Sequence, residues 1–132
     1  MLSVRTIVNS RLSQKLKKDE DAPYYGKTLE FSSTKQKAPT AFPTLNVISL
    51  GEPSTADNLA GTKQCAIIST IELIAYANTR LSDARNLLDK AGDVMLSMGY
   101  SLIYGPEDIS DSNYIMVARF RRLVGGGDIE NM

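Results

Sequence analysis

The stretch "ARFRRLVGGGD", Ala118 to Asp128, places three arginines within four residues and follows them with three glycines. Residues of these types could bind phosphate, the arginines through charge and the glycines through exposed backbone amides. The glycine run lacks the lysine and the hydroxyl of a phosphate loop, and no helix pattern follows it. A flexible C-terminal tail over residues 125–132 fits both the glycine content and the position of this run.

The arginines belong to an alternating pattern that predicts a β-strand over Asn113–Val124. Because alternate side chains of a strand point to opposite faces, Arg119 and Arg121 share one face and Arg122 points to the other. Three cations without an aromatic stacking platform beside them make a small footprint for nucleic acid. We therefore favour a strand end that is solvated or contacts another subunit, and a small nucleic-acid-binding module is the weaker alternative.

Glu72 is the one carboxylate within a long apolar strand pattern. If its face of the strand is dry, the charge needs a partner, and Arg119 or Arg121 on a neighbouring strand or subunit would serve. If that face is open to solvent, no partner is required. A catalytic acid would need a second carboxylate at a defined spacing, which this pattern does not offer.

The chain contains no histidine, so it lacks the commonest general base and the commonest metal ligand. Its single cysteine, Cys65, cannot form an internal disulfide and starts a strand that reads as buried, which predicts a small core residue rather than a nucleophile. No metal-binding cluster, nucleophile elbow or dinucleotide fingerprint is present in the sequence. We expect a protein without enzyme activity, metal or cofactor.

Fifteen basic and fifteen acidic residues balance in a chain of 132 residues. This length predicts a single domain, residues 1–132, with a core of its own. Phosphate binding scales with the number of lysines and arginines engaged, so a net charge of zero argues against a protein whose main role is to bind nucleic acid.

The apolar run "CAIISTIELIAYA" is too short to span a bilayer, and the N-terminus lacks a signal-peptide layout. We expect a soluble protein in a reducing cytosol, with no membrane partner.

Hydrophobic periodicity predicts the elements that position these residues. Apolar side chains recur at three- and four-residue steps over Val4–Lys18, which predicts an amphipathic helix. Residues 19–41 have a weak pattern and are expected to form a mobile excursion with a short strand in "YYGKTLEF". Alternation then predicts strands at Phe42–Leu50 and Cys65–Tyr76, separated by the polar loop "GEPSTADNLAGT". Two further strands, "YSLIYG" and "NYIMVARFRRLV", are joined by the loop "PEDISDS".

A second helix is predicted over residues 83–98, with Ser82 as its N-cap and Gly99 as its left-handed end. Gly92 within this helix indicates either a close approach of the backbone or a tolerated imperfection. The apolar stripe of this helix is Ala84, Leu87, Leu88, Ala91, Met95 and Met98. Because the strands run in groups instead of alternating singly with helices, we expect an α+β fold, an antiparallel β-sheet flanked by two main α-helices.

The order of these segments resembles a family of phage proteins. "IELIAYANT", "SDARNLLDKAGDVMLSMGY", a proline loop and "YIMVARFRRLVGGGD", preceded by the N-terminal helix and "FPTLNVISL", are similar to the small tail terminators of long-tailed bacteriophages, especially those of Gram-positive hosts. These are also called tail-completion or minor structural proteins. The resemblance covers most of the chain and least of residues 19–41.

The resemblance implies an α+β domain that assembles as a ring, typically a hexamer, on the last ring of the tail-tube protein. There it would stop tube growth and offer the surface that the head-tail connector protein joins. The expected location is the virion, at the junction of tail and head, after assembly in the host cytoplasm. DNA would be only passing cargo, and no enzyme activity or cofactor is implied.

Ring assembly requires a contact between two different patches of identical subunits. We expect the loop from Glu52 to Lys63, together with the strand face that carries Arg119 and Arg121, to contact the adjacent subunit or the tail tube. The candidate contact residues are Glu52, Asp57, Asn58, Lys63, Glu72, Arg119 and Arg121. A head-completion or connector-adaptor protein of the same virion is the alternative, and its binding partner would distinguish it.

Overall fold

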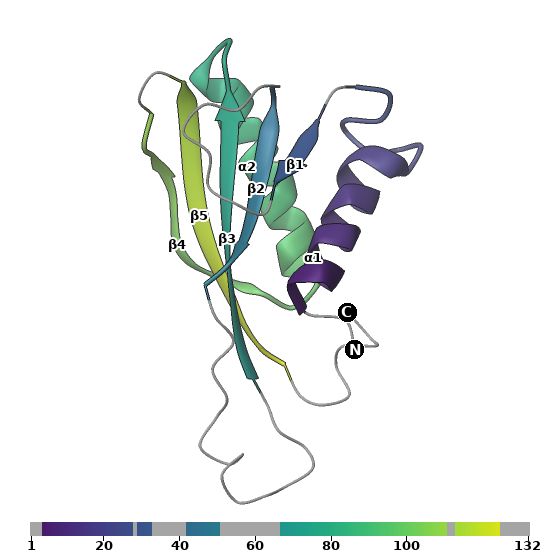
Figure 1. The fold of residues 1–132 in the computed structure, drawn as a ribbon, viewed down its shortest axis with the longest axis vertical. Helices are drawn as coiled ribbons and strands as arrows, with labels where there is room; N and C mark the ends of the chain where they lie inside the picture. Colours follow the sequence, from purple (N-terminus) through teal and green to yellow (C-terminus); the bar gives the residue numbers. More distant parts are fainter. Residues whose placement is uncertain (1–3, 28, 33–41, 51–66, 111–112, 125–132) are drawn as a thin grey trace, which may run out of the picture.

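The computed structural model describes residues 4–27, 29–32, 42–50, 67–110 and 113–124, which form one sheet with two helices against one of its faces (Figure 1). This arrangement confirms the expected α+β fold. In chain order the elements are α1 (Val4–Ser13), the π-helical turn η1 (Gln14–Lys18), β1 (Glu30–Ser32), β2 (Thr44–Ser49), β3 (Ile67–Ala77), α2 (Leu81–Ser97), β4 (Ser101–Asp108) and β5 (Tyr114–Val124).

The five strands lie in the order β1-β2-β3-β5-β4, so that β3 and β5 form the centre of the sheet. Eleven register pairs join β3 to β5, from Ile67 with Val124 to Ala77 with Tyr114. The pairs β2–β3, β3–β5 and β4–β5 are antiparallel, as expected, whereas β1 runs parallel to β2. A parallel neighbour cannot be reached by a tight hairpin turn. The chain separates β1 from β2 by residues 33–43.

Two-residue periodicity divides the central strands as the sequence predicts. The side chains of Ile71, Leu73 and Ala75 join the core beneath the helices, together with Met116, Ala118 and Phe120 of β5. The opposite face carries a second buried cluster of Ile74, Tyr76, Ile115 and Val117. The sheet therefore buries apolar side chains on both faces over its central part.

Helices α1 and α2 contribute their apolar stripes to the same core. Val8, Leu12 and Leu16 of the N-terminal helical segment are buried, which confirms the amphipathic helix predicted over Val4–Lys18. Its last turn widens to a π-helical turn, where the Asp19 amide donates to the Gln14 carbonyl at 2.9 Å. All six stripe residues predicted for α2 are buried, with Met98 directly after the last helical residue.

The ends of α2 agree in part with the prediction. Gly99 adopts the expected left-handed conformation, with φ of +86°. At the start, the helix begins at Leu81 after the extended residue Arg80, so Ser82 lies inside the first turn and the N-cap prediction is wrong. The Thr79 hydroxyl instead donates to the carboxylate of Asp83. At Gly92, a Cβ atom would lie 3.3 Å from Cζ of Phe120, which confirms a close approach.

Strand β4 extends further than predicted. It continues through Gly105 and Pro106 to Asp108, into residues that were expected to form a loop. An edge strand tolerates proline because its outward side needs no backbone donor. Two irregularities in the register with β5, on either side of Tyr104, accommodate this continuation.

Strand β1 covers only the last two residues of "YYGKTLEF" and adds Ser32, because Tyr24 and Tyr25 lie in hydrogen-bonded turns. Some predictions concern residues outside the described ones. These are the last part of the excursion predicted over residues 19–41, which falls in residues 33–41; the polar loop and Cys65, which fall in residues 51–66; and the glycine tail, residues 125–132. Among the described residues, no helix combines the length and the apolar character that crossing a membrane requires.

Candidate functional site

Glu72 and Arg119 form an ion pair on the sheet face opposite the helices. They are register partners on β3 and β5, and Nε of Arg119 donates to Oε2 of Glu72 at 2.7 Å. Glu72 is only 8% exposed. The Glu72 side chain is therefore largely shielded from solvent and its charge is compensated within the chain, so the alternative in which Glu72 has a partner holds, with Arg119 on the neighbouring strand as that partner.

Arg119 also contacts the edge strand. Its guanidinium carbon lies 5.2 Å from the centroid of the Tyr104 ring, within the range of a cation–π interaction. The hydrogen bond to Glu72, followed by the charge of that carboxylate, raises the pKa of Arg119 above its already high ordinary value. The Tyr104 hydroxyl donates in turn to the carboxylate of Glu107. A polar chain of four side chains thus crosses the sheet from β3 to β4.

Arg121 lies on the same face as Arg119, two residues further along β5. Its register partners, Thr70 and Ser101, are uncharged, and Arg121 makes no ion pair with any residue that the structure describes. Leu123, the next residue on this face, is 59% exposed. The end of β5 therefore presents a cation beside an apolar side chain, which we call the β5 tip (Arg121 and Leu123).

Strand β4 carries exposed apolar side chains that the sequence pattern did not single out. All eight of its residues are exposed, including Leu102, Ile103 and Tyr104 in succession, at 46%, 44% and 39%. A signal for this exposure was present in "SLIYG", because three consecutive large apolar residues cannot all point to one buried face of a strand. Leu102 lies on the helix side with Phe120 and Tyr104 on the opposite face with Arg119, so this edge strand presents exposed apolar side chains to both sides. Clustered exposed apolar side chains are typical of surfaces that bind other proteins.

A groove separates β4 from α2 on the helix side of the sheet. Its volume is about 220 Å³. Phe120 and Gly92 lie in its floor, and Leu96, 55% exposed, lines it together with Leu102. The exposed carboxylates of Asp89 and Asp93, one helical turn apart on α2, also line it. We call this feature the α2–β4 groove; it is apolar within and acidic along one side.

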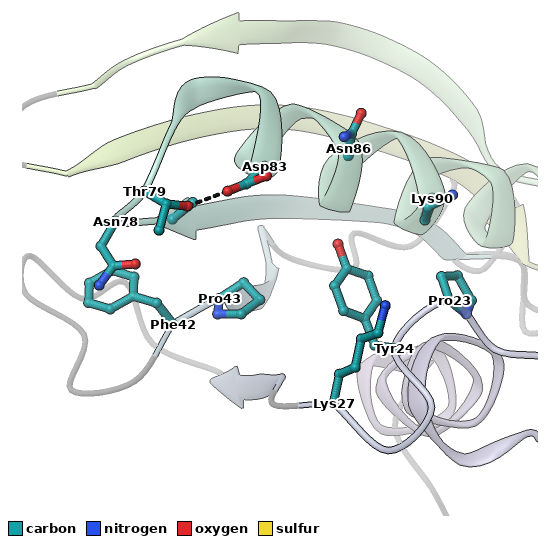
Figure 2. A pocket seen from close by; sticks show the side chains of 11 residues that line it. Pro23, Tyr24, Lys27, Phe42, Pro43, Asn78, Thr79, Asp83, Asn86 and Lys90 are labelled. Atoms are coloured by element: carbon teal, nitrogen blue, oxygen red, sulfur yellow. Dashed lines mark hydrogen bonds between the residues drawn. The ribbon is translucent and has the colours of Figure 1, made fainter.

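A second hollow of about 370 Å³ lies between the start of α2 and the segments that precede β1 and β2 (Figure 2). Figure 2 shows the Tyr24 hydroxyl pointing toward α2, with the side chains of Phe42 and Pro43 along the neighbouring wall. Partial burial, and then the charge of Asp83, raise the pKa of Tyr24 above the ordinary 10.0. Tyr24 therefore stays protonated at neutral pH and can act only as a neutral hydrogen-bonding group.

The chemistry open to this hollow is limited. Asp83 is the only carboxylate among its described lining residues; it accepts a hydrogen bond from Thr79 and lies 3.8 Å from Nε of Arg80. General acid–base catalysis by paired carboxylates would need a second one within reach. Among the described residues, no group of three or more histidine, cysteine, aspartate and glutamate side chains could hold a metal ion. We assign no reaction to this hollow.

The structure thus brings together three of the seven predicted contact residues, Glu72, Arg119 and Arg121, on one face of β3 and β5. The other four, Glu52, Asp57, Asn58 and Lys63, lie outside the described residues. Comparison of the chain with models of protein families and with curated proteins finds no match.

Proposed function

We propose that this chain is a structural virion protein that caps the tail tube of a long-tailed bacteriophage as a ring, stops tube growth and provides the surface for head–tail joining. The observation that carries the proposal is the exposed apolar surface of β4 beside the α2–β4 groove. A surface of this kind suits permanent contact with other proteins. The similarity of the segment order to tail terminators supplies the particular assembly.

The distribution of charge supports a protein partner over nucleic acid. Of the three arginines in "ARFRR", Arg119 is engaged with Glu72, and Arg122 lies on the helix side of the sheet, close to Gly99. Within this described strand, Arg121 alone presents a cation without an ion pair on the open face, too little for a phosphate-binding track. The net charge of zero agrees with a ring through which DNA slides without being held.

Electron microscopy of the purified protein, alone and mixed with tubes of the phage tail-tube protein, tests the proposal. We expect rings seated on one end of each tube. Rings that bind the portal complex of the head and leave tube ends bare would instead identify a head-completion or connector-adaptor protein. Retention on DNA with a steep salt dependence, and no ring on either partner, would point to a nucleic-acid-binding module.

A further inference from the structure

We propose that the α2–β4 groove of one copy of this chain receives the β5 tip of the next copy. The inference rests on the proposed function to the extent that it requires self-association, and it names the two surfaces that meet. Both surfaces belong to the described residues.

The apolar parts of the two surfaces match in kind. The groove offers exposed Leu96 and Leu102 above a floor formed by Phe120, and the β5 tip offers Leu123, the most exposed large apolar side chain of the described chain at 59%. Burial of a leucine side chain from water is favourable in proportion to the apolar area removed. One protruding leucine and one apolar groove therefore stabilise each other when brought together.

The charged parts are complementary. Asp89 and Asp93 line the groove, while Arg121 stands beside Leu123 on the β5 tip. None of these three charges forms an ion pair with another described residue. Complementary charges at the rim of an interface fix its register and exclude wrong partners. A leucine that enters the groove would carry the arginine toward the two carboxylates.

The positions of the two surfaces determine what kind of assembly results. The groove lies on the helix side of the sheet, where Leu102 pairs with Phe120, whereas Arg121 and Leu123 lie on the opposite face. One copy can therefore use its groove and its β5 tip at the same time, toward two different neighbours. Such a heterologous contact continues from copy to copy and yields a closed ring when the rotation between copies closes.

An alternative contact between copies would be backbone pairing of β4 with a strand of another copy, and the structure of β4 disfavours it. Pro106 has no backbone donor, and the register with β5 shifts on either side of Tyr104. Proline and bulges are features by which edge strands resist pairing with further strands. The side chains of β4, rather than its backbone, are the available binding material.

A charge exchange tests the contact. Asp93→Arg and Arg121→Asp, made singly, should each raise the dissociation constant of the oligomer at least about tenfold, because each places like charges together. The double variant restores the attraction in reversed order and should return the constant to within about threefold of the original protein. Sedimentation velocity over a concentration series measures this, and capping of tail tubes counted by electron microscopy is used if rings form only on tubes.

Matched controls lie elsewhere on the surface. Glu20→Arg and Lys18→Asp make the same kind of charge change at exposed positions where the N-terminal helical segment ends, outside both surfaces, and should leave assembly unchanged. For the apolar part, Leu123→Ser should weaken assembly, whereas Leu50→Ser, at a position 46% exposed, should not. Far-UV circular dichroism of each variant verifies that it is folded.

The outcomes separate this inference from the proposed function. Normal assembly of Asp93→Arg and Arg121→Asp would overturn the contact, while rings on tube ends would leave the capping function in place. Loss of assembly in both single variants without recovery in the double variant would also overturn the direct contact. A protein that stays monomeric both alone and with tubes would overturn both proposals.

Discussion

Gly105 should be the position in β4 that least tolerates a side chain. Its φ is +83°, and a Cβ atom there would lie 2.4 Å from the Val117 carbonyl oxygen, part of the backbone of β5. Gly99 provides a matched control, because its φ of +86° is nearly the same but its nearest obstacle, at 3.2 Å, is Nε of the flexible Arg122 side chain. Both positions have a positive φ, so alanine is strained at each of them, and the backbone obstacle at Gly105 adds to that strain.

The expected losses of unfolding free energy follow from these contacts. Gly99→Ala should cost about 1–2 kcal/mol, the usual strain of a left-handed residue with a Cβ atom. Gly105→Ala should cost about 3–5 kcal/mol, because β4 must also move away from β5. Urea unfolding followed by circular dichroism, at one protein concentration so that assembly contributes equally, measures both.

Hydrogen exchange locates the loss. The amides of β4 that bond to β5 should lose protection in Gly105→Ala and keep it in Gly99→Ala. Equal destabilisation by the two substitutions, or unchanged protection of β4 in Gly105→Ala, would refute the reasoning.

Two further predictions concern charged groups. Arg119→Met should lower stability by leaving the Glu72 carboxylate buried without its partner, and adding Glu72→Met should recover most of the loss; an additive result in thermal unfolding would contradict the pairing. Asp83→Asn should lower the pKa of Tyr24 while leaving it above 10.0, because burial is the larger cause of the shift, and an NMR titration of the ring carbons measures it. Since the folded-state pKa of Tyr24 is raised, its contribution to stability is present below about pH 10 and is lost as the pH rises through the folded-state value.

The fold could be predicted to a large extent because each central element has one dominant periodicity. Alternation along β3 and β5 indicates which side chains share a face of each strand and so allows Glu72 to meet Arg119, and the apolar stripe of α2 identifies its buried side. These patterns are set by burial, which repeats along the chain and is visible in the sequence. The direction of β1 was not predictable in this way, because parallel and antiparallel neighbours can carry the same short pattern.

The candidate site was harder to predict, because it depends on which strand lies at the edge. "SLIYG" has the composition of a buried strand, and its place beside β5 at the edge of the described sheet leaves Leu102 and Ile103 exposed. The α2–β4 groove likewise joins residues from three elements that are separated in the sequence. Gly92 was a local signal for the groove, because Phe120 approaches it closely and both residues line that groove.

The three arginines of "ARFRR" show how strand geometry changes the meaning of a cluster in the sequence. Close together in the chain, they reach three environments: Arg119 joins Glu72 and Tyr104, Arg122 passes to the helix side near Gly99, and Arg121 stays exposed beside Leu123. A phosphate-binding surface would need several uncompensated charges side by side, whereas the pleat turns Arg122 to the helix side and Glu72 compensates the charge of Arg119. The geometry leaves a single cation paired with an apolar neighbour, which is a combination suited to an acidic, apolar groove on a protein.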